Sequence, residues 1–148
     1  MRIAPLILTL MVICLLLGCG ESPKQKALEA FTHEEIELGL RLLPTYCNTC
    51  HGVGNREMDE MLSPPLWAIR DVYLAKYPEP EAFVSAMVEF MQFPRDETAL
   101  MPDEVQNYGL MTTVSLGESD LRATAIVIYA GYIERPSWYR DYEKSLSK

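Results

Sequence analysis

The strongest constraint on this chain is a group of two cysteines and a histidine within five residues, at Cys47, Cys50 and His51. Cysteines three residues apart cannot join distant segments, so a disulfide framework does not explain how the chain folds. The spacing instead fits the CxxCH pattern of c-type haem attachment. On one helical turn, two thiols reach neighbouring vinyl groups on one edge of a porphyrin, and the next residue places an imidazole under the iron. The sequence therefore predicts one covalently bound haem c per chain, with His51 as an iron ligand.

Cysteines and histidines at this spacing also occur in two other kinds of site. A thioredoxin-like redox pair should follow a strand in an α/β pattern, and no such strand is visible in the sequence. A structural zinc site needs four nitrogen or sulfur ligands, whereas an exported form of the chain offers only Cys47, Cys50, His51 and His33. His33 also stands at a solvated helix start, so we do not expect it to bind the iron. Haem attachment is therefore the preferred interpretation.

The N-terminus has the layout of a secretory signal peptide. Residues 1–18 hold a single charge, and the apolar run from Leu6 to Leu17 is shorter than the roughly 20 residues of a membrane span. The run ends in Gly18-Cys19, which resembles the lipobox of bacterial lipoproteins, where cleavage before the cysteine leaves a lipidated thiol. We expect residues 19–30 to form a polar tether that begins at lipidated Cys19. The resemblance implies an exported lipoprotein, anchored on the periplasmic or cell-surface side of a membrane.

The rest of the chain shows helical patterns and no alternating strand pattern of convincing length. Thr32 and Glu35 form a capping box, which predicts a helix over 33–43 that Pro44 ends or kinks. Further helices are expected over 80–93, over 102–108 with Gly109 at its end, and from Gly117 to before Pro136. Residues 52–65 are expected to form a loop, and residues 136–148 form a tail with Trp138, Tyr139 and Tyr142. The predicted class is all-α, with three to five short helices around one haem.

With the attachment motif placed, residues 31–135 resemble a class I monohaem cytochrome c. In that family a glycine on the first helix stands eight residues before the first cysteine, and Gly39 has that position here. The resemblance implies that Gly39 lets the last helix cross closely, with Tyr132 as the crossing aromatic and Tyr129 beside it. It also implies that the carbonyl of Pro64 accepts a hydrogen bond from the ligand histidine and that Leu66 touches the haem.

In that family the second axial ligand is a methionine from the loop before the last helix. Two methionines of this chain are candidates for that role. Met101 is followed by Pro102, a proline that commonly accompanies the ligand. Met111 has the better spacing, since it lies six residues before Gly117 and its loop leads directly into the last helix. We expect Met111 to bind the iron and keep Met101 as the alternative.

Charge narrows the possible functions. The chain has 13 Lys and Arg against 21 Asp and Glu, a net charge of -8, which argues against nucleic-acid binding. A His/Met-ligated haem has no open iron site, so the expected function is electron transfer between redox partner proteins rather than catalysis. The acidic surface suits a partner with a basic docking surface. Two alternatives stay open: a haem module that binds or senses a small ligand, and a subunit that delivers electrons to a larger redox enzyme.

Overall fold

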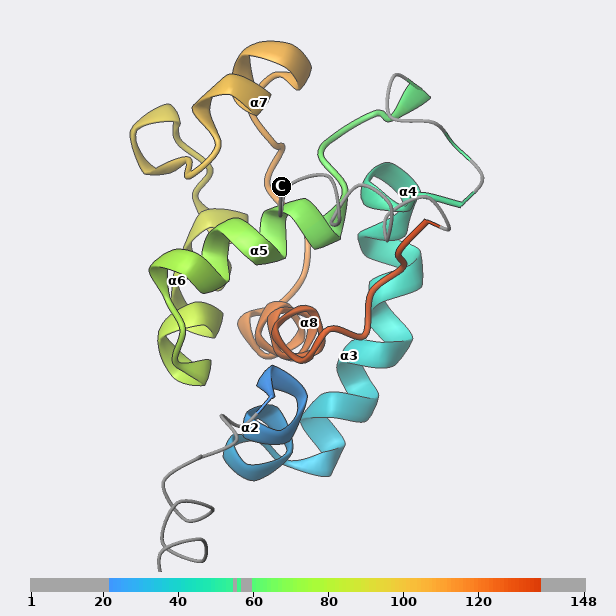
Figure 1. Ribbon diagram of the computed structural model, residues 1–148, viewed down its shortest axis with the longest axis vertical. Coiled ribbons are helices and arrows are strands. Elements are labelled where there is room, and N and C mark those ends of the chain that lie inside the picture. Colours follow the sequence, from blue (N-terminus) through green and yellow to red (C-terminus); the bar gives the residue numbers. More distant parts are fainter. Residues whose placement is uncertain (1–21, 55, 57–59, 137–148) are drawn as a thin grey trace, which may run out of the picture.

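The structure is a computed structural model, which describes residues 22–54, 56 and 60–136. Over these residues the chain is entirely helical, with seven α-helices, one 3-10 helix and no strand (Figure 1). The all-α prediction is confirmed, but the expected number of three to five helices is too low. The helices are α2 (Pro23–Ala30), α3 (His33–Tyr46), α4 (Asn48–His51), α5 (Leu66–Lys76), α6 (Pro80–Gln92), α7 (Pro102–Tyr108) and α8 (Glu118–Ala130).

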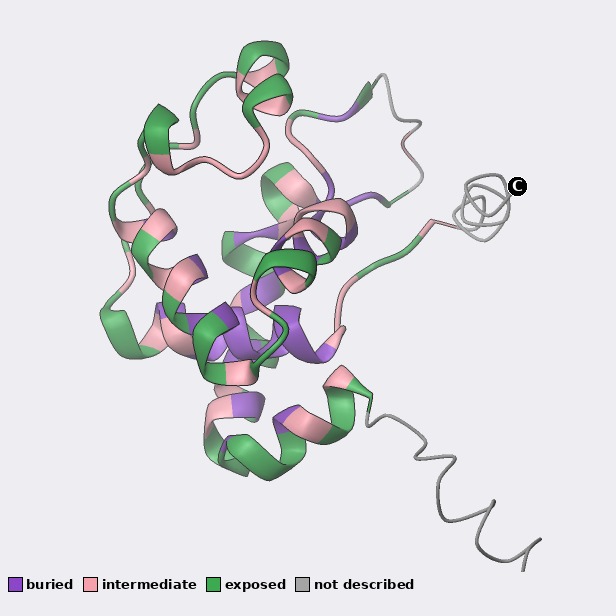
Figure 2. Ribbon diagram, turned by 60° about the vertical axis from the view of Figure 1, so that its left-hand side comes forward, coloured by how far each residue is buried: buried purple, intermediate pink, exposed green. Residues whose placement is uncertain are grey.

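Helix α8 forms the centre of the molecule. It packs against α2, α3, α5 and α6, and Figure 1 shows it nearly end-on with these helices around it. The sequence predicts an apolar stripe along this helix, yet every residue from Ala123 to Ala130 is buried (Figure 2). Small side chains at Ala123 and Ala125 let neighbouring helices approach on several faces. A helix that is buried all round needs apolar or small residues on every side, which is what this segment supplies.

The crossing of α3 and α8 depends on Gly39. A Cβ atom built on Gly39 would lie only 2.8 Å from the carbonyl carbon of Ala123 and 2.8 Å from Cγ1 of Val127. The close approach of two helices at Gly39 therefore occurs as expected. The atoms nearest to this Cβ belong to Ala123 and Val127, and the ring of Tyr129 packs on Phe83 at 5.2 Å. The role of Tyr132 as the crossing aromatic stays a prediction.

Gly39→Ala is expected to destabilise the protein by about 1–3 kcal/mol, the usual cost of overpacking a tight contact. Alanine gains up to about 1 kcal/mol of helix propensity, but the new methyl group meets the backbone of α8, which cannot move cheaply. Urea unfolding followed by circular dichroism measures the change. Leu40→Ala, on the exposed face of the same helix, is the control and should cost well under ~1 kcal/mol. A Gly39→Ala variant as stable as the parent would contradict this account of the crossing.

Helix α3 begins as predicted and ends later than predicted. Thr32 and Glu35 make both hydrogen bonds of the capping box. Pro44, however, lies inside the helix, which continues to Tyr46. Proline removes one backbone donor, and the carbonyl left without its helical partner belongs to Leu40. Both Leu40 and Pro44 are exposed, so water can satisfy that carbonyl and the helix continues.

The expectation of a tether is wrong for residues 23–30, which fold as α2 against the core. Ser22 caps this helix by accepting a hydrogen bond from the backbone N–H of Gln25 at 3.2 Å. Ala27 is fully buried, and α2 contacts both α8 and α6. Lys26 pairs with Glu79 at 3.3 Å. The polar composition of this segment therefore reflects a helix with one narrow buried face.

Helix α5 was not expected from the sequence, and it connects the loop after α4 to the central helix. Its buried residues include Leu66, Trp67 and Tyr73, together with one charged residue, Arg70. The Arg70 side chain donates from Nε and Nη2 to the carbonyl of Tyr129 at 3.0 and 2.9 Å. A cation at the C-terminal end of α8 is favourable because free carbonyls carry partial negative charge there. Arg70 thereby fixes α5 against α8.

Two of the remaining helices match the predicted bounds closely, and the last one ends earlier than predicted. Helix α6 begins at Pro80 and ends at Gln92, and α7 spans 102–108 and ends at Gly109 with φ 82°. Helix α8 starts directly after Gly117 but ends at Ala130, because Gly131 adopts the left-handed conformation at φ 84°, and it does not continue to Pro136. A 3-10 helix over Asp96–Thr98 lies between α6 and α7. The described residues of 52–65 are mostly irregular, as expected for a loop.

Arg122 joins three helices through two carboxylates. It donates to Glu81 on α6 at 2.7 and 2.9 Å and to Glu35 on α3 at 3.0 Å. Burial opposes ionisation of Glu35, but hydrogen bonds from Thr32 and Arg122 outweigh it and lower the pKa of Glu35. The hydrogen bond from Arg122 lowers the pKa of Glu81 as well. Both carboxylates therefore favour the folded state when they are ionised.

This cluster predicts a pH-dependent contribution to stability. Because the pKa values of Glu35 and Glu81 are lower in the folded state, their contribution is complete above the unfolded pKa of about 4.3 and declines as the pH falls. Arg122→Gln is expected to lower the urea midpoint at pH 7 and to change it much less at pH 3. Urea titrations of both proteins across this pH range measure the effect. Equal differences at both pH values would contradict the ionic account.

Several predicted features fall on residues that the structure does not describe. These are the signal peptide over 1–18, the lipidation site Cys19, and the tail from residue 137 onward with its three aromatic residues. Within the described part of the chain, no helix has the length and apolar character needed to cross a membrane.

Candidate functional site

The two cysteines and the histidine stand at a tight junction between α3 and α4. The backbone N–H of Cys47 still bonds to Leu43 at 3.0 Å, and the N–H of His51 bonds back to Cys47 at 2.9 Å. The chain turns away from this single helical turn directly after His51. Gly52 allows this because a side chain at that position would collide with Asn48. A Cβ at Gly52 would lie 3.0 Å from the Cβ of Asn48 and closer still to its carbonyl oxygen. The motif is thus held on one helical turn, as its spacing predicts.

Every predicted site residue within the described part of the chain lines one cavity of about 290 Å³. Its walls come from the α3–α4 junction, α5, α6 and the segment from 99 to 114. The volume lies just below the range of about 300–1,000 Å³ that is usual for small-molecule sites. The predicted residues on its walls are Cys47, Cys50, His51, Pro64, Leu66, Met101 and Met111.

His51 is oriented by the loop that follows it. Its Nδ1–H donates to the carbonyl oxygen of Pro64 at 2.6 Å, the hydrogen bond that the family resemblance implied. The hydroxyl of Ser63 lies 3.1 Å from the same nitrogen. Burial lowers the pKa of His51 and outweighs the opposing effect of the Pro64 carbonyl. The imidazole is therefore neutral at pH 7, with Nε2 available as a ligand atom.

The two cysteines differ in their surroundings. Cys47 is buried and Cys50 is exposed, and neither forms a disulfide. Burial, with a smaller effect of Cys50, raises the pKa of Cys47 to about 11. Thiols that exchange disulfides have lowered pKa values because the thiolate is the reactive form. A buried thiol of raised pKa, in a part of the chain without strands, argues against a thioredoxin-like function.

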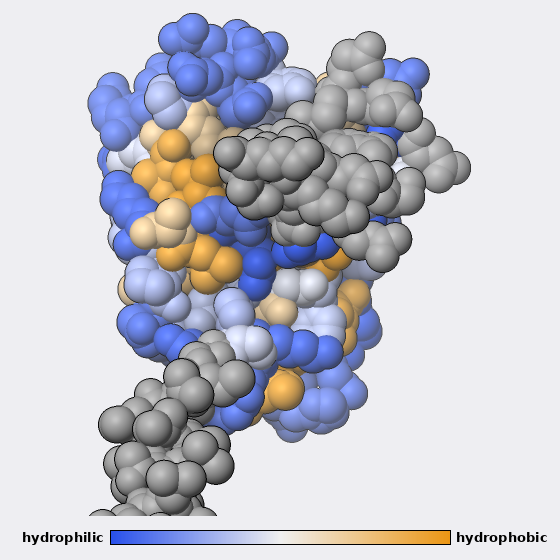
Figure 3. Space-filling view, viewed as in Figure 1, coloured by the Kyte–Doolittle hydropathy of each residue, from blue (hydrophilic) through white to orange (hydrophobic). Residues whose placement is uncertain are grey.

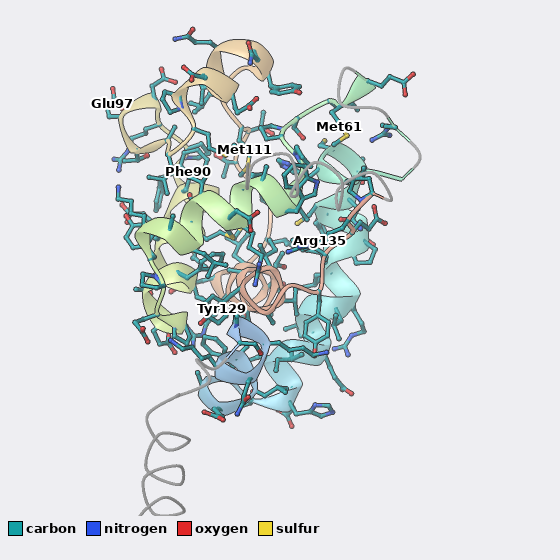
Figure 4. The ribbon with its side chains drawn as sticks, in the orientation of Figure 1. Met61, Phe90, Glu97, Met111, Tyr129 and Arg135 are labelled. Atoms are coloured by element: carbon teal, nitrogen blue, oxygen red, sulfur yellow. The ribbon has the colours of Figure 1, made fainter. Side chains whose placement is uncertain are left out.

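The two candidate methionines enter the cavity from different places. Met101 directly precedes α7, whereas Met111 lies in the extended chain between α7 and α8 (Figure 4). Met111 is partly buried and packs against the main hydrophobic core. The N–H of Val114 bonds to the carbonyl of Met91 at 3.4 Å, which fixes the returning chain on α6. The structure brings both methionines to the cavity lining.

The sequence analysis did not identify the residues at the mouth of the cavity. Tyr46, Leu62 and Leu110 line the cavity and are all substantially exposed, at 47%, 64% and 38%. Glu104 is the one acidic residue among the lining side chains. Only the position of Ser63, directly before Pro64, could have suggested a second contact to the histidine. The three exposed residues carry no sequence signal, because they come from α3, the loop before α5 and the segment after α7 and meet only in the folded chain.

No family model, curated protein or solved structure matches this chain. The site must therefore be interpreted from its own chemistry. Among the described residues, no three His, Cys, Asp or Glu side chains gather to hold a metal ion. A zinc site of the usual three or four such ligands is accordingly not found in this part of the chain.

The residues present do fit a haem. Two thiols one helical turn apart lie on the same cavity as a neutral, oriented imidazole. Met101 and Met111 add two thioether side chains to the same lining, and most of the remaining wall is apolar. A c-type haem uses this combination of covalent attachment, nitrogen or sulfur ligands and an apolar surround.

Proposed function

We propose that this chain is a c-type electron-transfer haem protein of the cytochrome c fold. The observation that carries the proposal is the hydrogen bond from His51 to Pro64, within a cavity that both cysteines and both candidate methionines also line. The bound haem would supply one-electron iron chemistry. Cys47 and Cys50 would hold it covalently, and His51 and Met111, with Met101 as the alternative to Met111, would bind the iron.

The chain itself controls the iron in three ways. The Pro64 carbonyl holds the imidazole of His51 in one orientation and makes Nε2 a better donor. Apolar side chains such as Leu66 and Met87 exclude water, so the surroundings change little between the two oxidation states. A methionine ligand stabilises ferrous iron and raises the reduction potential. The availability of two methionines favours an electron carrier over a module with an open iron site for a small ligand.

The sequence supports a proposal for the location and the partners of the protein. We propose an exported lipoprotein, cleaved before Cys19 and held on the periplasmic or cell-surface side of a membrane by lipid on that thiol. Multiple acyl chains would be needed, because a single chain gives only marginal membrane binding. Its net charge of -8 suits redox partners with basic docking surfaces, and their association should weaken with salt.

Acid-acetone extraction of the denatured, purified protein tests the haem proposal. Because thioether bonds survive denaturation, the haem is expected to stay with the polypeptide. The double variant Cys47→Ser and Cys50→Ser is the matched control and should release any haem into the organic phase. Haem that leaves the parent chain as readily as the control would refute covalent attachment. A parent protein purified without haem after export would refute the function as a whole.

A further inference from the structure

A second cavity of about 260 Å³ lies at the C-terminal end of α5, between α6 and the 3-10 helix. It is distinct from the first, because none of the proposed haem-attaching or iron-binding residues lines it. Its lining includes three aromatic rings, from Tyr73, Tyr77 and Phe90, and three charged groups, from Lys76, Glu89 and Glu97. The ammonium of Lys76 lies over the ring of Tyr77, 5.4 Å from its centroid. Phe90 and Glu97 lie on the same side of the molecule in Figure 4. In Figure 3 this side also carries apolar surface between α6 and α7.

One layer of side chains separates the two cavities. Tyr73, Phe90, Ala99 and Leu100 line both of them. A molecule in the second cavity would therefore contact the same side chains that contact the occupant of the first. If the first holds a haem, as proposed above, an electron has to cross only this shared wall. The second cavity is thus placed for a small electron donor.

The lining selects the chemical class of that donor. The ring of Phe90 offers a packing surface for a flat aromatic molecule, whereas Lys76 covers one face of the Tyr77 ring. Arg95 pairs with Glu89 at 3.7 Å, which leaves Glu97 as the carboxylate that we assign to accept a hydrogen bond and then a proton from a hydroxyl group. The ammonium of Lys76 on the same wall offsets the charge of Glu97, so the lining favours a molecule without net charge. Flat shape, hydroxyl donors and absence of net charge together describe a neutral aromatic diol.

We propose that the second cavity binds small hydroquinone-type donors and that they reduce the haem iron across the shared wall. This inference rests on the proposed function of the first cavity. In each transfer an O–H bond of the donor breaks, its electron goes to ferric iron, and its proton goes to the carboxylate of Glu97. The neutral phenoxyl radical leaves, and two such radicals disproportionate to one quinone and one hydroquinone. Each hydroquinone consumed thus reduces two ferric proteins.

Stopped-flow reduction of the ferric holoprotein by benzene-1,4-diol tests the proposal. The rate is expected to saturate with donor concentration, as binding before electron transfer requires. Ala86→Trp fills the cavity from α6 and should lower the rate about tenfold or more by excluding the donor. Hexaammineruthenium(II), which donates electrons without a binding site, should reduce both proteins equally well. A rate that stays linear in the diol, or is unchanged in Ala86→Trp, would overturn the proposal.

Two further measurements keep the test independent of folding and of the haem. Glu97→Gln should keep the saturation but lower the limiting rate, whereas Glu118→Gln, on the exposed first turn of α8, should change neither. The redox-inert ring 1,4-dimethoxybenzene should give a saturation-transfer NMR signal with the parent protein and lose it in Ala86→Trp. Absence of that signal in the parent would refute the cavity as an aromatic site. Absence of haem would instead refute the proposed function.

Discussion

His51→Ala is expected to abolish the absorption spectrum of low-spin, six-coordinate haem. His51 is the only imidazole among the residues that line the main cavity, so no other imidazole can replace it there. The loss should also lower haem retention during export, because the attachment turn no longer orients the iron. Optical spectra of the oxidised and reduced protein, normalised to haem by the pyridine haemochrome assay, measure the effect. The thioether bonds themselves do not depend on His51, so any attached haem should change its spectrum and stay on the chain.

His33→Ala is the matched control for this substitution. His33 is the other histidine of the chain; its side chain is 82% exposed and pairs with Glu37 at 3.1 Å on the first turn of α3. Its replacement should leave the spectrum unchanged. Equal loss of the spectrum in both variants would mean that the effect comes from folding or export. A normal spectrum in His51→Ala would exclude His51 as the iron ligand.

The sequence predicted elements whose ends have local chemical causes. Thr32 and Glu35 satisfy free N–H groups of α3 through their own side chains, so the start of that helix can be located from four residues. Pro80 and Pro102 each open a helix at the position where proline loses no hydrogen bond. Gly109, at φ 82°, ends α7 in a conformation that other residues rarely adopt.

The elements that were missed depend on tertiary contacts. Helix α2 buries only Ala27 completely, so its sequence is as polar as that of a linker, and its position on α8 cannot be deduced from composition. Helix α5 hides a charged residue, Arg70, on its buried face, where a sequence pattern predicts apolar side chains. Arg70 belongs there because the carbonyl of Tyr129, 59 residues further along the chain, accepts its hydrogen bonds. Such a pairing has no local signal.

The predicted site also has features with local causes and features that depend on contacts between distant residues. The spacing of Cys47, Cys50 and His51 fixes their geometry on one turn, and the structure has that turn. The contact of His51 with Pro64 spans 13 residues and was expected only because the chain resembles a family that has it. The second cavity was not expected at all. It forms where α5, α6 and the 3-10 helix meet, and no motif marks its lining.

Met111→Ala is expected to remove the near-infrared band that sulfur ligation gives to ferric haem, and to lower the reduction potential. Met111 stands on a segment that begins after Gly109 at the end of α7, and a hydrogen bond from Val114 to Met91 holds that segment at the cavity wall. Without it, the sixth position of the iron opens to small ligands such as cyanide or imidazole. The potential falls because a thioether favours ferrous iron more than water or a nitrogen ligand does. Near-infrared absorption and a potentiometric titration measure both effects.

Met101→Ala is the matched variant that separates ligation from packing. Met101 lines the same cavity and is only partly buried, so its truncation should cost less than the ~2–5 kcal/mol of a fully buried methionine. Its near-infrared band and potential should stay those of the parent. A band that survives in Met111→Ala and disappears in Met101→Ala would assign the ligand to Met101. The proline after the methionine would then be the better guide, because the chain would bind the iron before α7 and not after it.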